Sequence, residues 1–256
     1  MQNDIYHEIA RLQDEGKEAA LATVTAASGS TPREEGAKML VRADGSIMGT
    51  IGGGSIEFQV IKEAMEVIER CRPKNFKYRL KEGEDLGMIC GGDVEVFIEP
   101  IISSPAMFIL GGGHISLALA KIAKMAGFKV TVVDNRPEYA TPERFPEAEQ
   151  TIVSGYDTAV SKLNVGKNGY IVIVTHGHKG DVDALEGALA TEAKYIGMIG
   201  SKTKNESVYG KLKAKGVTQE QIDRVYAPIG LPIHAQTPEE IAVSIIAEII
   251  KVRRED

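Results

Sequence analysis

The sequence is poor in cysteine: Cys71 and Cys90 are the only two in 256 residues. A protein held together by a disulfide framework carries more cysteines for its size, so this count favours a reducing compartment. A basic surface is also not indicated, because 30 lysines and arginines face 36 aspartates and glutamates and the formal net charge is -6. This excess of acid argues against non-specific nucleic-acid binding and against attraction to an anionic membrane.

Long hydrophobic runs are missing as well. The most apolar stretches, such as residues 241–252, are too short for a membrane span or are interrupted by charge or glycine. The first residues are polar and acidic, and they lack the basic and apolar regions of a secretory signal peptide. We therefore expect a cytoplasmic protein with neither a membrane nor a nucleic acid as its partner.

Two halves of the chain differ in their pattern of apolar residues. Residues 1–102 contain two amphipathic helical segments, a hairpin signal around residues 43–45 and short alternating strands. Residues 106–256 instead alternate short Val/Ile-rich runs with helical segments, which is typical of parallel strands covered on both faces. We predict an α/β protein with a smaller N-terminal α+β domain over residues 1–102. A Rossmann-type, doubly wound parallel sheet is predicted over residues 106–256, after a polar linker.

The first apolar run of the second half is followed by a turn that resembles the dinucleotide-binding motif. Residues 111–116 read G-x-G-x-x-S, in which Gly111 permits the tight turn and Gly113 lets the backbone approach a pyrophosphate at a helix start. Asp134 ends the next strand, where an acid binds an adenosine ribose. We predict a nucleotide at this turn, with NAD(P) as one candidate; a domain that kept the fold and lost the ligand is the alternative. Arg136 could contact a phosphate, or it could be a structural ion-pair partner.

A second glycine-rich loop lies in the first half. Gly52, Gly53 and Gly54 precede Ser55, which we expect to cap the following helix and to offer a hydroxyl to a ligand. Backbone amides at such a helix start form an anion nest. Three glycines cost more folding entropy than a plain turn requires, so a ligand is favoured over a flexible turn. Upstream, the polar residues 30–33 could present a guanidinium to a phosphate, and a surface turn explains them nearly as well.

Cysteine and histidine provide the other candidate groups. Cys90 lies among glycines, where a thiolate could bind a soft metal or carry sulfur, although a buried inert thiol is equally compatible. His176 and His178 follow a central strand, at the edge where open α/β sheets bind ligands. With Asp181 they are similar to a metal-ligand run, but the additional histidines and cysteine pairs of a tight metal site do not follow, so we expect no metal there. His178 could transfer a proton, or it could cap a helix or face solvent.

Eight segments together resemble the xanthine dehydrogenase accessory factor family, the XdhC/CoxI family. In family order they are GSTPREEGAKMLV, GTIGGGSIE, CGGDVEVFIEP, ILGGGH, VVDNRPEYA, VTHGHKGDVDAL, YIGMIGSKTK and APIGLPIHAQTPEEIAVSI. They span nearly the whole chain, and the first three are specific to this family. The positions that the resemblance carries over are Gly52, Gly53, Gly54, Glu57, Cys90, Gly111, Gly113 and Asp134.

The resemblance implies a factor that binds molybdenum cofactor (molybdopterin), protects it during sulfuration and delivers it to a xanthine dehydrogenase-type apoenzyme. It also implies a cysteine desulfurase as a second partner, and a homodimer. Such a carrier would turn over nothing itself, which leaves catalytic residues undefined. The alternative class is an NAD(P)-dependent oxidoreductase, for which His178 with Asp181 would be the candidates. Across both classes the candidate catalytic residues are Cys90, His178 and Asp181. The glycine loop of the first half has no evident purpose in that alternative.

Overall fold

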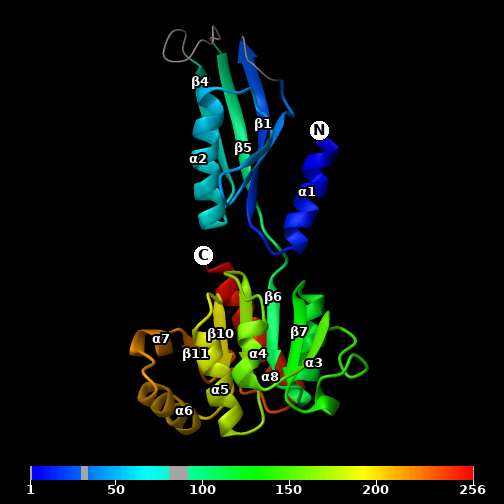
Figure 1. Ribbon diagram of the computed structural model, residues 1–256, viewed down its shortest axis with the longest axis vertical. Helices are drawn as coiled ribbons and strands as arrows, with labels where there is room; N and C mark the ends of the chain where they lie inside the picture. The colour runs from blue at the N-terminus through cyan, green and yellow to red at the C-terminus, as the bar shows by residue number, and fades with distance from the viewer. Residues whose placement is uncertain (1, 30–33, 81–91, 256) are drawn as a thin grey trace. The chain divides into compact units, whose positions relative to one another are not determined.

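The computed structural model describes residues 2–29, 34–80 and 92–255. It divides into two compact units, Met1–Ser103 and Ser104–Asp256. Each unit has its own sheet, as Figure 1 shows, and each is described by itself below. The division falls between Ser103 and Ser104, within the polar segment 103–105 of the sequence.

The described residues of the first unit form a five-stranded antiparallel sheet with helices against it (Figure 1). The strand order is β3-β2-β1-β5-β4, and every neighbouring pair is antiparallel. In chain order the elements are α1 (Gln2–Asp14), β1 (Ala19–Gly29), β2 (Lys38–Arg42), β3 (Ile47–Gly49), α2 (Ser55–Arg70), β4 (Lys74–Leu80) and β5 (Gly92–Ile101).

Both faces of this sheet are covered because side chains alternate along its strands. On β1, Ala20 and Ala22 point into the core that α2 covers. Ala19 and Leu21 point the other way, into a smaller core with Ile5 of α1. The small side chains of β1 therefore let two helices pack on opposite sides of one central strand.

The second unit is a six-stranded parallel sheet with the order β11-β10-β9-β6-β7-β8. Read from the β8 edge and counted from β6, this is the 3-2-1-4-5-6 order of the Rossmann fold, so the predicted fold class is confirmed. The elements are β6 (Ala106–Leu110), α3 (His114–Met125), β7 (Lys129–Asp134), η1 (Pro137–Tyr139), β8 (Gln150–Val153), α4 (Tyr156–Lys162), β9 (Gly169–Ile173), α5 (His178–Leu189), β10 (Tyr195–Met198), α6 (Lys202–Ala214), α7 (Gln219–Asp223), β11 (Val225–Tyr226) and α8 (Pro238–Arg254).

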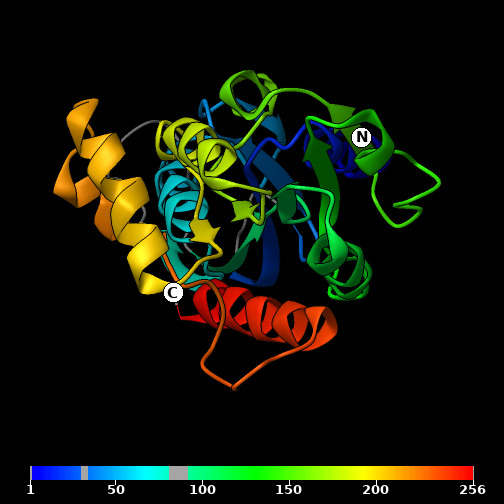
Figure 2. The same ribbon diagram turned by 90° about the horizontal axis from the view of Figure 1, so that it is seen from below.

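Helices cover both faces of this sheet, which explains why its strands read as continuous apolar runs. α3 and α8 pack on the face that includes Ile109 and Val172. α4, α5 and α6 pack on the face that includes Leu110 and Ile173. Figure 2 shows α8, in red, on the opposite side of the sheet from α4 and α5.

Local contacts define the start of α8. Thr237 and Glu240 form a reciprocal capping box, in which each side chain bonds the backbone of the other residue, and Pro238 is the first helical residue. In the described parts of the chain, no helix combines the length and the apolarity that crossing a bilayer requires.

The two central strands of the second unit leave the sheet toward opposite faces. β6 and β9 are hydrogen-bonded neighbours, but β6 continues into α3 and β9 into α5, which belong to different layers. This is the topological switch point, beyond which open α/β sheets bind their ligands. Gly111 follows β6 at this edge, and Thr175 and His176 follow β9.

Candidate functional site

The glycine loop between β3 and α2 has a backbone shape that favours glycine. Gly52, Gly53 and Gly54 all have positive φ, at 138°, 80° and 68°. A side chain is strained in this region, so the conformation itself explains three successive glycines. A Cβ placed on Gly53 would meet nothing within 4 Å, which leaves the backbone approachable at that residue.

Glu57, in the first turn of α2, fastens this loop from within. Its Oε1 accepts hydrogen bonds from the hydroxyl of Thr50 and from the amides of Ile51 (3.2 Å) and Gly53 (3.0 Å). The amide of Gly52 donates to the Thr50 hydroxyl at 3.1 Å. The carboxylate thus occupies the part of the nest formed by residues 51–53. The amides left for an external anion are those that follow, which have no acceptor within the helix.

The predicted cap of α2 is wrong. The residue before the helix is Gly54, and Ser55 is the first helical residue, without a side-chain cap hydrogen bond. The cap position has φ 68° and ψ -147°, which a serine adopts only with strain. The Glu57 carboxylate, and not a serine hydroxyl, accepts hydrogen bonds from amides of the loop. The next residue, Phe58, is 77% exposed and is not among the buried residues of α2.

Two predicted groups of the first unit lie outside the described residues. They are Cys90 and the polar loop residues Ser30, Thr31 and Arg33. Their suggested roles therefore stay predictions.

The Rossmann turn is held by close backbone contacts. The amide of Gly111 donates to the carbonyl of Val133 at 2.7 Å, and a Cβ at Gly111 would overlap the Val174 carbonyl. A Cβ at Gly112 would overlap the carbonyl of Tyr139. At Gly113 a Cβ would meet nothing within 4 Å. Close packing therefore explains the first two glycines, whereas the third position is open.

The serine in the last position of the fingerprint is accommodated. Ser116 is fully buried, and its hydroxyl donates to the carbonyl of Gly111. A small hydroxyl thus replaces the usual glycine and bonds α3 to the turn without separating the helix from the strand.

Asp134 also lies where the spacing predicts, at the end of β7, but its carboxylate is engaged by the protein. Oδ2 accepts from the amide of Gly112 (2.7 Å) and from Nη2 of Arg136 (2.9 Å). Oδ1 accepts from the backbone amide of Arg136 (3.0 Å) and from its Nε (2.9 Å). Burial alone would raise the pKa of Asp134, but the hydrogen bonds from Arg136 and Gly112 outweigh it and lower the pKa to about 2. Of the two roles considered for Arg136, the structure shows the ion-pair partner.

Two further side chains close around the same turn. The guanidinium of Arg136 lies 3.5 Å from the centre of the Tyr139 ring, and that of Arg144 lies 5.0 Å from it. Nε of Arg144 donates to the carbonyl of Gly112 at 3.1 Å. Gly112 is thus held through its amide by Asp134 and through its carbonyl by Arg144. Sequence reasoning missed these contacts: Tyr139 lies in the VVDNRPEYA segment, but the motif does not show what its side chain touches, and Arg144 lies beyond it.

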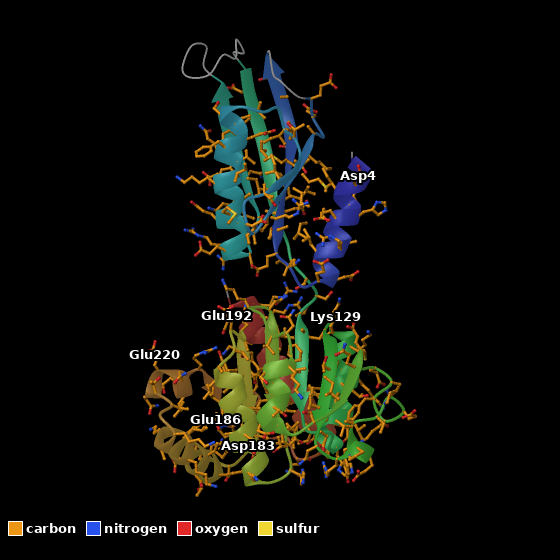
Figure 3. All side chains as sticks on the ribbon, in the orientation of Figure 1. Asp4, Lys129, Asp183, Glu186, Glu192 and Glu220 are labelled. Carbon is orange, nitrogen blue, oxygen red and sulfur yellow. The ribbon has the colours of Figure 1, made fainter. Side chains whose placement is uncertain are left out.

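The histidine segment carries a buried ion pair. Asp181 is 0% exposed; its Oδ1 accepts from the Thr175 hydroxyl at 2.7 Å, and its Oδ2 lies 2.5 Å from Nζ of Lys204 on α6. Asp183 and Glu186, which lie with Asp181 on α5 and are labelled in Figure 3, are partly exposed. Asp181 therefore faces inward and links β9 to α6, and it is not presented to a substrate.

The two histidines of this segment are placed differently. His176 is exposed just after β9, and His178 begins α5, with its side chain outside the described part of the structure. Within the residues that the structure describes, no three His, Cys, Asp or Glu side chains come together as a metal site. The acid–base pair suggested for an oxidoreductase thus lacks an available carboxylate at Asp181.

Comparison with known families covers both units. A model of the XdhC Rossmann domain matches residues 107–249, and a model of the XdhC and CoxI family matches residues 12–79. The chain belongs to the XdhC/CoxI family. The resemblance inferred from the motifs is therefore confirmed.

Relatives of this XdhC/CoxI member include three curated proteins. Uncharacterized protein YqeB of Escherichia coli K12 is 36% identical over 253 residues, which cover 98% of this chain but 46% of YqeB, so the chain spans about half of that relative. A probable xanthine dehydrogenase subunit of Bacillus subtilis is 25% identical, with 95% of this chain and 96% of the relative covered. The molybdenum cofactor insertion chaperone PaoD of E. coli K12 is 25% identical, with 93% and 84% covered.

A solved structure has a similar fold. It is the crystal structure of a xanthine dehydrogenase from Bacillus halodurans, 23% identical to this chain, with 97% of this chain and 95% of that chain covered and a TM-score of 0.55. At this identity the likeness concerns the fold alone.

Proposed function

We propose that this chain is an accessory factor for a molybdenum hydroxylase of the xanthine dehydrogenase type. It binds molybdenum cofactor as cargo and inserts it into the apoenzyme, without turnover of its own. The observation that carries the proposal is the family match in both units, together with two relatives named for xanthine dehydrogenase and for molybdenum cofactor insertion. YqeB is about twice as long as this chain and does not bear on the proposed activity.

The glycine loop of the first unit is the proposed contact for the cofactor. Molybdopterin carries a phosphate, and the first amides of α2, which have no acceptor within the helix, follow Gly53, where a Cβ would meet nothing within 4 Å. Gly52, Gly54 and Ser55 complete this proposed surface, and Glu57 positions it through its bonds to the loop. Phe58, in the first turn of α2, is 77% exposed, and we propose that its ring supplies a flat apolar surface for the pterin.

Sulfuration is the second part of the proposal. A soft thiolate at Cys90 would contact the metal or the sulfur source, with a cysteine desulfurase as partner and a homodimer as the working form. If Cys90→Ala bound molybdenum cofactor and supported sulfuration like the wild type, this part of the proposal would be wrong, and the carrier role would stand.

Cofactor binding is the direct test of the carrier role. Purified protein is mixed with molybdenum cofactor released from a molybdoenzyme, and the molybdenum that co-elutes with the protein is measured. Phe58→Ala removes an exposed ring, so it should leave the fold intact and reduce retention several-fold. Met125→Ala is the matched control, because Met125 is an 87% exposed apolar residue at the end of α3.

Transfer to the apoenzyme completes this experiment. The loaded protein is added to a cofactor-free dehydrogenase, whose activity is then followed. If an unrelated Rossmann protein retained as much molybdenum as the wild type, the carrier role would be refuted. If Phe58→Ala retained as much molybdenum as the wild type, the proposed role of the ring would be refuted.

A further inference from the structure

The end of β7 is where a dinucleotide-binding fold recognises adenosine. The acid at this position accepts hydrogen bonds from the ribose hydroxyls. A carboxylate offers about four acceptor positions, two on each oxygen. In this chain Gly112 and Arg136 supply four donors to Asp134, two to each oxygen. A ribose hydroxyl would have to displace a donor that belongs to the protein.

The group that would bind the 2′-phosphate of NADP is also engaged by the protein. Folds that bind such nucleotides use an arginine near this acid to hold the extra phosphate. Arg136 is that arginine by position, but it already forms a two-point contact with Asp134 and lies on the Tyr139 ring. A phosphate that took the guanidinium would lie against a buried carboxylate that holds its negative charge at neutral pH.

The neighbouring backbone is closed by the same segment. The space next to Gly112 is filled by the carbonyl of Tyr139, and Arg144 binds the Gly112 carbonyl. The amide of Gly112, which a ligand phosphate could otherwise approach, points to Asp134. Residues 136–144 thus close over the turn from the side of β7.

From these contacts we propose that Arg136 is a latch on the Rossmann turn, which occupies the ribose-binding positions of Asp134 and excludes nicotinamide dinucleotides. The residues that usually select NAD or NADP bind each other here. The unit therefore keeps the Rossmann fold without the adenosine recognition of a dehydrogenase.

Direct binding of NADH and NADPH tests the latch. The chain contains no tryptophan, so binding is followed by the fluorescence of the reduced nicotinamide and by equilibrium dialysis. Wild-type protein should show no saturable binding of either nucleotide up to millimolar concentration. Arg136→Leu removes the two side-chain donors but keeps the backbone amide, so it frees one acceptor position on each oxygen. This variant should bind NADH at least ten-fold more tightly than the wild type.

Control variants separate the latch from general loosening of the turn. Arg144→Ala removes a guanidinium near the same ring that does not bond Asp134, so it should gain no NADH affinity. If Arg136→Leu does not fold, Arg136→Gln retains one donor and should show a smaller gain. Asp134→Asn in combination with either Arg136 variant should abolish the gain, because the acceptor for the ribose is altered.

Two results would overturn the proposal. Saturable binding of NADH or NADPH by the wild type would show that the turn is not latched. A folded Arg136→Leu protein without any gain would show that Arg136 is not what closes it. The experiment uses no molybdenum cofactor, so its failure is distinct from failure of the proposed carrier function.

Discussion

The two glycine-rich turns of this chain look alike in sequence, but the structure uses them differently. In both, a carboxylate that follows the glycines binds the amides of the turn: Glu57 from α2 in the first unit and Asp134 from β7 in the second. The donors to Glu57 are a hydroxyl and two amides, all neutral. Asp134 is fully buried and has Arg136 as a charged partner.

The two turns also differ in which backbone positions the protein covers, although Gly113 of the second turn is open like Gly53 of the first. In the first loop the Gly53 amide donates to Glu57, but the space on the side where a Cβ would lie is open. The second turn is covered at Gly112 by the Tyr139 carbonyl and is bonded at both backbone groups of Gly112. A run of glycines therefore indicates a close approach of the backbone, but what approaches can be a ligand or the protein itself.

The largest effect is expected from Asp134→Asn. The change removes the buried, negative partner of an ion pair whose arginine is partly exposed, and leaves amide hydrogens facing the donors of Arg136 and Gly112. We expect a loss of about 3 kcal/mol in the free energy of unfolding, measured by urea denaturation followed by circular dichroism. Asp183→Asn is the matched control, since Asp183 is partly exposed on α5, and it should change stability by less than about 0.5 kcal/mol. Equal stability of the two variants would contradict the buried pair.

The pH dependence of stability is a second test of the Asp134–Arg136 pair. The pKa of Asp134 is about 2 in the folded protein against an ordinary value of 3.8. A carboxyl with a lowered folded pKa stabilises the folded state above its unfolded pKa and loses that contribution as the pH falls through the folded value. The wild type should therefore lose stability relative to Asp134→Asn as the pH falls from about 4 toward 2. Parallel curves over that interval would argue against the assigned contacts.

A smaller loss of stability is expected from alanine at Gly112, and almost none from alanine at the adjacent Gly113. Gly112→Ala places a methyl group on the Tyr139 carbonyl and should reduce stability by about 2–3 kcal/mol. Gly113 has φ -74° and open space around it, so Gly113→Ala should change stability by less than about 0.5 kcal/mol. Thermal unfolding of the two variants measures the contrast. Similar losses in both would mean that the turn does not pack against Tyr139.

The smallest effect is expected in the first loop. Glu57→Ala removes the acceptor of two amides and a hydroxyl at a partly exposed site, and should reduce stability by about 1–2 kcal/mol. Glu57→Gln keeps a carbonyl acceptor and should lose less. Hydrogen exchange at the amides of Ile51 and Gly53 checks this directly, because both should exchange faster in Glu57→Ala. Unchanged protection would show that Glu57 does not hold the loop.

Much of the fold follows from the sequence pattern. The Val/Ile runs and the helical periodicity of the second half predict a parallel sheet, because only strands buried on both faces are apolar throughout. The start of α8 follows from Thr237, Pro238 and Glu240, whose capping contacts are local in sequence. The capping of α2 could not be predicted in the same way. It depends on the backbone angles of Gly54 and on bonds from Glu57 to the preceding loop.

By itself, the sequence determined the family, the Rossmann order of elements and the places of both glycine turns. These depend on periodicity and on motifs of adjacent residues, which are visible without coordinates. Only the tertiary structure decided what the carboxylates do: Asp134 binds Gly112 and Arg136, and Asp181 binds Thr175 and Lys204. The physical reason is that a carboxylate satisfies its acceptors with whichever donors the fold brings to it. Arg136 and Thr175 are near in sequence, but Gly112 and Lys204 come from other segments, and the sequence pattern does not show that they meet these carboxylates.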